Sequence, residues 1–468
     1  MKDRKWRSGI AALICLLLFF SCKKENLITG SDALVSLSAD TVRFDTVFTS
    51  AGSVTDLILI YNDNDGKLLL DKVTLAGGEA SPFRINADGS PGPEIRNIEI
   101  AARDSIYVFI TVKIDPTTVT QPFLVSDSIE IQFNGNSRMV QLQAYGQNAN
   151  FLRTYRVSSN ETWTNEKPYV ILGGLQVMEN AVLTIEEGTQ IYVHADGPIL
   201  VDGSLVVNGN HYDSTRVTFR GDRLDAPYKH YPAGWPGIFF RKSSRNNVLN
   251  FARILNAYQG IVAEGLSQNT NPKVQLNQVI IDNCYDAGVL AVGADVEMNN
   301  TLVSNCGKGI ILAYGGKYRL THSTVAAVSN QMILHKEPSL LITDFIKDGD
   351  QLFTAALDAQ FTNCIFWGDG GPVEDEVVVG REGVQNFSVR FEHSIWKIKN
   401  EPAGVQQVNM LNADPLFDTL NSISGIYNFR LKENSPAINH GLPTGILTDL
   451  DGRPRNSATP DAGAYEKE

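Results

Sequence analysis

Three consecutive 22-residue segments decide the fold of this chain: KVQLNQVIIDNCYDAGVLAVGA (273–294), DVEMNNTLVSNCGKGIILAYGG (295–316) and KYRLTHSTVAAVSNQMILHKEP (317–338). They align without a gap, so polar residues and glycines recur at the same positions: Asn277 over Asn299, Asn283 over Asn305, Cys284 over Cys306 and Gly293 over Gly315. Three apolar columns run through all segments: Leu276, Met298 and Leu320; Ile281, Val303 and Val325; Leu290, Leu312 and Leu334. A period of about 20–30 residues built from short β-branched runs indicates a solenoid, in which each repeat buries its apolar face against its neighbours.

The same pattern continues on both sides of these repeats. Towards the N-terminus, short strand-like runs end in glycine at 199–209 and 217–221. Towards the C-terminus, a five-residue motif recurs as NNTLV (299–303), THSTV (321–325), TNCIF (362–366) and EHSIW (392–396), with Cys364 at the place of Thr301 and Ser323. This alignment puts His322 and His393 in one column with Asn300 and Asn363, which we interpret as a hydrogen-bonding ladder along the solenoid.

The C-terminal region contains the phrases DPLF (414–417), NFRLKENSPAINHG (428–441), DLDGRPR (449–455) and DAGAYE (461–466). Together with the runs between Leu183 and Ile261, this ending resembles right-handed parallel β-helix proteins of the pectin-lyase-like superfamily. The resemblance implies a fold and a capping role for 449–452. That superfamily includes polysaccharide lyases, glycoside hydrolases, adhesins and members without an assigned activity, so the fold alone does not assign a reaction.

The segment before the solenoid has the alternation of an all-β domain. Ile106 to Ile114 alternate with polar and aromatic residues at period 2, and Asn134-Gly135 predicts a tight hairpin turn. Several short strands separated by turn signals indicate an immunoglobulin-like sandwich. The phrases LILIYN (57–62) and LQAYGQ (142–147) resemble the Ig-like modules that precede β-helices in Bacteroidetes surface lipoproteins.

The N-terminus is typical of a processing signal. A basic start precedes the apolar run Ile10–Phe20, which is too short to span a bilayer, since spanning needs about 20 residues. Ser21-Cys22 resembles a bacterial lipobox, which implies lipidation of Cys22; the alternative is an ordinary signal peptide with a chance cysteine. Lys23 in place of aspartate favours the outer membrane, on its periplasmic or cell-surface face.

The expected fold class is therefore all-β, with an Ig-like β-sandwich followed by a right-handed parallel β-helix. The predicted segments are a signal peptide (1–21), a tether (22–33), the sandwich (34–148), a linker (149–164) and the β-helix with its C-terminal cap (165–468).

Charge and cysteine content exclude several classes of function. The net charge is −12 and becomes −15 when residues 1–21, with four basic residues and one acidic residue, are removed. So acidic a chain without a basic stripe is not expected to bind nucleic acid. Cys284, Cys306 and Cys364 do not form a disulfide framework, and we expect buried thiols. No histidine joins them at ligand spacing, and Asp63–Gly66 and Asp449–Gly452 lack the other positions of a calcium loop, so neither a metal site nor a cofactor is predicted.

The insertion at 221–237 is the best candidate for ligand contact. It concentrates charged and aromatic side chains that suit a sugar with or without a carboxylate: Arg223, Asp225, Tyr228, Lys229, His230, Tyr231 and Trp235. We favour the other interpretation of this loop, in which it folds onto the solenoid and Trp235 and Tyr231 cover an exposed wall.

No recognisable catalytic constellation accompanies these residues, and the catalytic residues remain unknown. Lyases need a base and a cationic group, and hydrolases need two facing carboxylates. The acidic run Glu374-Asp375-Glu376 is most simply a solvated loop. We therefore favour a non-catalytic binding or structural role at the membrane surface, with polysaccharide as the expected ligand. A polysaccharide lyase or glycoside hydrolase, with a site built from distant residues, is the alternative, and host adhesion is a third.

Overall fold

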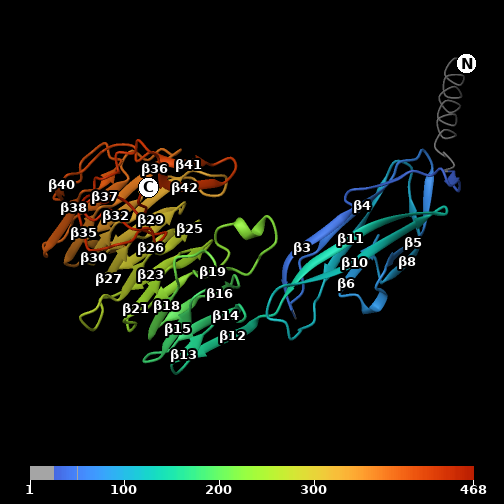
Figure 1. Cartoon of the computed structure of the whole chain (residues 1–468), viewed down its shortest axis with the longest axis horizontal. Coiled ribbons are helices and arrows are strands. Elements are labelled where there is room, and N and C mark those ends of the chain that lie inside the picture. The colour runs from blue at the N-terminus through green and yellow to red at the C-terminus, as the bar shows by residue number, and fades with distance from the viewer. Residues whose placement is uncertain (1–25, 50, 468) are drawn as a thin grey trace, which may run out of the picture. The chain divides into compact units, whose positions relative to one another are not determined.

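The computed structural model describes residues 26–49 and 51–467 and is almost entirely β-structure (Figure 1). Its contacts divide the chain into two compact units, Met1–Asn148 and Ala149–Glu468. Within the described ranges the helical turns are two short 3-10 helices, η1 (Gly78–Ala80) and η2 (Tyr228–His230). No helix in those ranges is long and apolar enough to cross a membrane. The predicted signal peptide and Cys22 lie outside the described residues.

The first unit is an immunoglobulin-like sandwich of two sheets, one with the order β2-β4-β9-β6-β7 and the other β1-β5-β10-β11-β3, with β8 on β5. The strands are β1 (Leu27–Ile28), β2 (Val35–Leu37), β3 (Thr41–Phe48), β4 (Asp56–Asn62), β5 (Lys67–Leu75), β6 (Phe83–Ala87), β7 (Ser90–Pro91), β8 (Glu94–Ile100), β9 (Ser105–Val112), β10 (Phe123–Phe133) and β11 (Asn136–Gln147). The period-2 prediction is confirmed in β9, where Ile106, Val108 and Ile110 are buried between exposed Tyr107 and Phe109. Asn134 and Gly135 both have positive φ and close the β10–β11 hairpin.

Part of the segment expected to be a tether belongs to this sandwich. Leu27–Ile28 pairs in parallel with β5, and the Asn134 amide donates to the carbonyl oxygens of Ile28 and Gly30. Because hydrogen bonds fix residues 27–30 to the sheet, the region 22–33 is not a free tether throughout.

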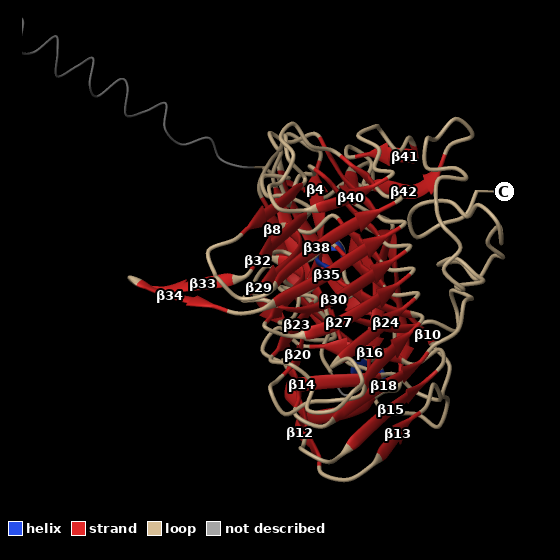
Figure 2. Ribbon diagram, turned by 90° about the vertical axis from the view of Figure 1, so that its left-hand side faces the viewer, coloured by secondary structure: helices blue, strands red, loops and turns tan. Residues whose placement is uncertain are grey.

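The second unit is a parallel β-helix with three walls, whose strands stack as rungs in Figure 2. Wall A is the ten-stranded sheet β13 (Glu161–Trp163), β15 (Val182–Glu186), β18 (Ser204–Asn208), β21 (Asn247–Asn250), β24 (Val274–Asn277), β27 (Asp295–Asn299), β30 (Gly316–Thr321), β35 (Leu357–Thr362), β38 (Phe387–Glu392) and β40 (Gln406–Val408). Wall B comprises β16 (Gln190–Val193), β19 (Val217–Gly221), β22 (Ala252–Leu255), β25 (Ile280–Asp282), β28 (Leu302–Ser304), β31 (Thr324–Val328), β36 (Ile365–Asp369) and β39 (Ile395–Trp396).

Wall C comprises β17 (Ile199–Val201), β20 (Ile238–Phe240), β23 (Ile261–Glu264), β26 (Ala287–Val292), β29 (Lys308–Ala313), β32 (Leu340–Thr343) and β37 (Val377–Gly380). The strands β12 (Asn150–Val157) and β14 (Tyr169–Val177) begin walls B and C together, because β14 pairs with both β16 and β17. A separate hairpin, β33 (Phe345–Asp348) and β34 (Gln351–Thr354), projects from the stack (Figure 2).

The region 149–164, predicted to be a linker, is the first coil instead. β12 pairs with β14, and β13 pairs with β15 through Trp163 opposite Ile185. Trp163 is buried and stacks on Tyr169, with ring centroids 4.2 Å apart. The first coil lacks the repeat seen later because only one of its sides faces another coil.

Single residues in the left-handed backbone region turn the corners between walls. Between walls A and B these residues are Phe251, Gln278, Asn300, His322, Asn363 and His393, and after wall B they are Asn256, Asn283 and Asn305, all with φ between 46° and 61°. Asparagine tolerates this region better than most side chains, because its short amide can hydrogen-bond locally. The recurring column of Asn283 and Asn305 therefore marks a corner, whereas Asn277 and Asn299 end wall A strands and hydrogen-bond to each other.

The sequence register is confirmed for walls A and B but wrong for wall C. Met298 pairs with Leu276 and Leu320, and Val303 pairs with Ile281 and Val325. In wall C the pairing is displaced by one residue, so Leu290 lies opposite Ile311 and Leu312 lies opposite Ala291 and Ile342. The displacement keeps inward-facing Ala291 and Leu312 together, whereas the 22-residue alignment would pair outward Leu290 with an inward residue. Leu334 is exposed in a loop and joins no column.

The predicted buried thiols are confirmed. Cys284, Cys306 and Cys364 are free and buried. Burial raises the pKa of Cys306 well above its ordinary value and that of Cys364 to about 12. These thiols therefore pack as small apolar groups rather than as nucleophiles.

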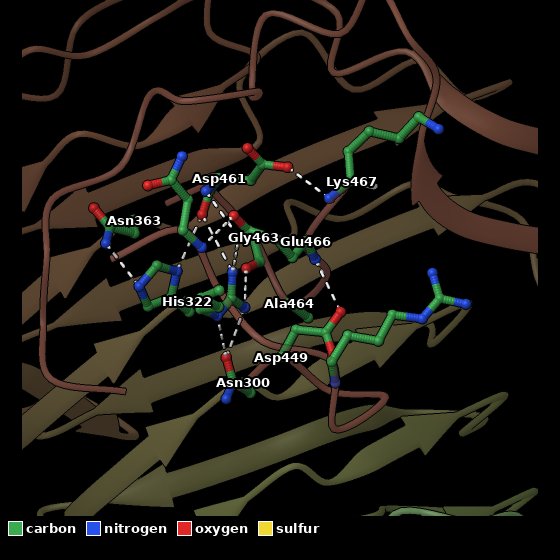
Figure 3. A network of polar contacts seen from close by, with 12 residues as sticks. Asn300, His322, Asn363, Asp449, Asp461, Gly463, Ala464, Glu466 and Lys467 are labelled. Carbon is green, nitrogen blue, oxygen red and sulfur yellow. Dashed lines mark hydrogen bonds and ion pairs between the residues drawn. The ribbon is translucent and has the colours of Figure 1, made fainter. Parts of the chain in front are cut away.

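The C-terminal segment folds back over wall B and forms a cap there. Its hairpin, β41 (Phe417–Asn421) and β42 (Ile426–Leu431), packs apolar side chains on the outer surface of β28, β31, β36 and β39. The ladder predicted for this corner column is confirmed only in part: His322 and Asn363 bond to each other (Figure 3), whereas Asn300 bonds to Thr448 and Arg455 of the cap, and His393 to the His440 carbonyl oxygen. His322 Nε2 accepts from the Asn363 amide at 2.9 Å, while Nδ1 donates to the Asp461 carbonyl oxygen at 3.1 Å.

Candidate functional site

The insertion between β19 and β20 is anchored to the solenoid through its backbone. The Asn256 amide donates to the Lys229 carbonyl oxygen at 2.8 Å, and the Asn283 amide donates to the His230 carbonyl oxygen at 2.9 Å. Trp235 is 1% exposed, and its indole N–H donates to the Leu255 carbonyl oxygen. For Trp235 the structure thus shows the packing alternative, in which the residue covers the solenoid, rather than ligand contact.

The charged side chains of Arg223 and Asp225 in the insertion pair with each other. Arg223 forms a two-pronged ion pair with Asp225, with both nitrogen–oxygen distances 2.7 Å, and its guanidinium lies 4.0 Å from the centroid of the Tyr228 ring. The ion pair lowers the pKa of Asp225 and raises that of Arg223. Tyr228 also makes an edge contact with Tyr231, with ring centroids 5.4 Å apart. Arg223, Asp225 and Tyr228 therefore brace the loop.

A groove opens on wall B between the insertion and the cap, and we call it the Asp282 groove. Its volume is ≈ 420 Å³. It is lined by three insertion residues, by the ends of wall B strands and their corners, by the loop at 330–332 and by the turn of the β41–β42 hairpin: Pro227, His230, Tyr231, Asn256, Asp282, Asn283, Asn305, Asn330, Gln331, Met332, Ser422, Ile423, Ser424, Gly425 and Tyr427. The groove exists because the insertion covers wall B on one side of these coils and the cap covers it on the other.

Asp282 is the central polar group of the groove. Its Oδ1 accepts from the Ser304 hydroxyl at 2.6 Å and from the Asn305 amide at 3.0 Å. Burial raises the pKa of Asp282, and the hydrogen bonds from Ser304 and Asn305 oppose that rise. A protonated Asp282 carboxyl could itself donate a hydrogen bond to a ligand oxygen.

Two further buried polar atoms in the groove lack a well-formed hydrogen bond to the described residues. Asn305 Oδ1 has no partner there, and the Tyr427 hydroxyl has only the Asn330 side chain near it. The Asn305 side chain is only 4% exposed. Buried polar atoms are almost always hydrogen-bonded, so these two call for a ligand or ordered water in the groove.

The composition of the groove suits a hydroxyl-rich, uncharged ligand. It offers amide donors and acceptors, a phenol, a half-buried carboxyl group and partly exposed aromatic rings. The described lining residues include one carboxyl group, Asp282, and no lysine or arginine. A glycosidase requires two carboxyl groups across the scissile bond. The groove as described therefore lacks the second group.

The structure brings only part of the predicted site together. His230 and Tyr231 line the groove, whereas Arg223, Asp225, Tyr228 and Lys229 do not, and Trp235 is buried. Asp282, Asn305 and Tyr427 were not foreseen as site residues. Asn305 carried a signal, because it recurs with Asn283 in the sequence register at the corner after wall B, but nothing in the sequence placed Tyr427 beside it.

The acidic run at 374–376 is not fully solvated, contrary to expectation. Glu376 is completely buried: it accepts from the Ser339 hydroxyl at 2.7 Å and lies 2.7 Å from His335 Nε2. His335 belongs to the same loop as Asn330, so this buried pair holds one side of the groove in place. No group of three or more His, Cys, Asp or Glu residues within 26–49 and 51–467 is arranged to hold a metal ion.

Comparisons with known proteins add little to this description of the groove. No protein-family model and no curated protein match the chain. A solved structure of a family 123 glycoside hydrolase from Clostridium perfringens, described for glycolipid glycan hydrolysis, is similar to part of it. That similarity covers 26% of this chain and 30% of the enzyme at 11% identity, with a TM-score of 0.19. The chain thus spans less than a third of that enzyme, and a likeness this low carries no argument about function.

Proposed function

We propose that this chain is a lipid-anchored outer-membrane protein that binds glycan in the Asp282 groove without cleaving it. The observation that carries the binding proposal is a pair of buried polar atoms without a well-formed hydrogen bond, Asn305 Oδ1 and the Tyr427 hydroxyl, in a groove rich in amides and aromatic rings. Ligand hydroxyl groups can both donate and accept, so they can satisfy both atoms at once.

A binding role fits the groove better than catalysis does. Hydrolysis needs a second carboxyl group, and elimination from a uronate needs a base with a cationic partner. Neither arrangement is found among the described groove residues. The net charge of −12 also disfavours polyanionic ligands.

Lipidation and location rest on the sequence, and the proposal extends to them. Cys22 in its lipobox-like setting would carry the anchor, and the sandwich would separate the solenoid from the membrane. Metabolic labelling with a fatty acid, followed by membrane fractionation, tests this part. We expect label and outer-membrane recovery for the natural chain and loss of both for Cys22→Ser; label retained by Cys22→Ser would refute it.

The binding proposal is tested with the mature chain, started at residue 23, and a panel of neutral and uronate-containing polysaccharides. Calorimetry measures binding, while reducing ends and unsaturated products report turnover. Tyr427→Phe keeps the ring and removes the hydroxyl, so we expect affinity to fall about threefold to tenfold, as for one lost hydrogen bond. The matched control is Tyr212→Phe, since Tyr212 is 63% exposed and outside the groove lining.

Three results would contradict the proposal. If no polysaccharide of the panel binds, the binding proposal is wrong. If Tyr427→Phe and Tyr212→Phe lose affinity equally, the ligand binds outside the groove. Turnover that disappears in Asp282→Asn would convert the assignment to an enzyme.

A further inference from the structure

A pair of exposed tyrosines lies beside the Asp282 groove. Tyr258 and Tyr285 occupy the same place on adjacent coils, with ring centroids 5.7 Å apart and ring planes at 27°. They are 47% and 53% exposed, so the stack belongs to the surface rather than to the core. Each follows a groove residue by two positions, Asn256 and Asn283, which limits the Cα separation to about 7 Å.

The tyrosine pair is part of a longer apolar strip. Trp235 pairs with Ala257, which sets Pro236 beside Tyr258 in the preceding coil. In the following coil the position equivalent to Tyr285 is Gly307. A Cβ atom added there would lie 2.3 Å from the Tyr285 carbonyl oxygen. Because Gly307 has no side chain, the stack ends at Tyr285. The strip extends over three coils, or about 10 Å at 4.8 Å per coil, which is the length of about two pyranose units.

A polar row runs directly alongside this strip. Asp286 Oδ1 lies 2.8 Å from Lys308 Nζ, and the Gln259 amide donates to Asp286 Oδ2 at 2.8 Å. The ion pair with Asp286 raises the pKa of Lys308 and lowers that of Asp286, so both stay charged and cancel. The row therefore offers hydrogen bonds without net charge.

From this juxtaposition we infer that Pro236, Tyr258 and Tyr285, with the row Gln259–Asp286–Lys308, form a second subsite for an uncharged polysaccharide. Sugar rings lie against the apolar strip through their C–H faces, and their hydroxyl groups bond to the polar row. The same chain continues from this subsite into the Asp282 groove. The inference rests on the proposed function and deepens it by fixing the ligand class as a neutral chain longer than a disaccharide.

The test uses the mature chain from residue 23 and neutral gluco-, manno- and xylo-oligosaccharides of two to eight sugars, with oligouronates as the charged comparison. For natural protein we expect affinity to rise with length beyond two sugars and to be weaker for oligouronates. One aromatic contact is worth about 0.5–1.5 kcal/mol, which corresponds to a threefold to tenfold change in affinity. Tyr285→Leu should lose this factor for long oligosaccharides and leave disaccharide binding within about twofold.

Control variants distinguish the loss of this subsite from the loss of folding and from the loss of binding in the Asp282 groove. Tyr285→Phe retains the ring and should bind like natural protein, and melting curves of both variants show whether they fold. Tyr427→Phe should weaken short and long ligands alike. Length-dependent binding that is lost in Tyr427→Phe but unchanged in folded Tyr285→Leu would overturn this inference and leave the proposed function standing. A preference for oligouronates would also overturn it, and absence of all binding would remove both.

Discussion

Replacing Arg455 by methionine tests whether the C-terminal cap is locked by one buried cation. The Arg455 guanidinium donates to Asn300 Oδ1 at 2.7 Å, to the Gly463 carbonyl oxygen at 2.9 Å and to Glu466 Oε2 at 3.0 Å. The side chains of Arg455 and Glu466 are 1% and 9% exposed. Methionine keeps most of the apolar stem but leaves the Glu466 carboxylate without its cation.

The expected cost follows from that burial. Removing one partner of a buried ion pair destabilises a protein by about 3–5 kcal/mol, because the other charge stays desolvated. The cap covers only the outside of wall B, so we expect it to open locally before the solenoid unfolds. A cost of this size raises the open population about a hundredfold to several thousandfold.

Hydrogen exchange at the cap measures this opening directly. The reporter amides are those of Ala462, Gly463 and Ala464, which bond to Ala437, Asn363 and Thr324. We expect faster exchange there, and partial recovery in Arg455→Met/Glu466→Gln, because the second change removes the stranded charge. The matched control is Lys399→Met, which breaks an ion pair with Glu374 whose side chains are 63% and 66% exposed and should leave exchange unchanged. Unaltered exchange at all three amides in Arg455→Met would refute the reasoning.

Other substitutions probe the ladder and the buried His335–Glu376 pair. Burial lowers the pKa of His322 to about 3, so on acidification this histidine is protonated in the unfolded chain before it is protonated in the folded protein. Its contribution to the free energy of unfolding is full above about pH 6.5 and falls by about 3 kcal/mol by pH 4. Urea unfolding at pH 7 and pH 4 measures this difference in free energy. His322→Asn should lose less stability between the two pH values than natural protein, and an unchanged pH dependence would contradict the reasoning. Glu376→Gln should cost about 1–3 kcal/mol in thermal unfolding, since it weakens buried hydrogen bonds; a melting temperature equal to that of natural protein would argue otherwise. Gly368→Ala should cost at least as much, because its Cβ would lie 2.0 Å from His335 Nε2, whereas Gly52→Ala meets nothing within 4 Å and serves as the control.

Sequence periodicity was sufficient to predict the pairing of strands in the repeating part of walls A and B. The columns through Leu276 and Ile281 pair as predicted because walls A and B keep a strict 22-residue period there. Wall C departs from the period by one residue, and alignment alone cannot reveal a slip when apolar residues stand on both sides of it. The first coil escaped prediction for a different reason: it has a neighbour on one side only and is not constrained to the repeat.

The candidate site was only partly predictable because its parts are distant in sequence. Density of aromatic and charged residues drew attention to 221–237, and His230 and Tyr231 do line the groove. Tyr427 reaches Asp282 only after the chain has folded back from the far end of the solenoid. No local pattern encodes that approach. Glu376 likewise resembled a surface charge until His335, 41 residues earlier, was placed beside it.

The cap also sets an order of events in folding. Arg455 and Asn300 are 155 positions apart, so the outer surface of β28, β31 and β36 stays uncovered until the end of the chain arrives. Contacts of such long range form slowly. Until the cap residues arrive, the apolar side chains on the outer surface of this wall have no covering layer. Closing that wall depends on the contacts of Arg455 with Asn300 and Glu466, so a variant shortened before Arg455 is expected to leave the wall exposed.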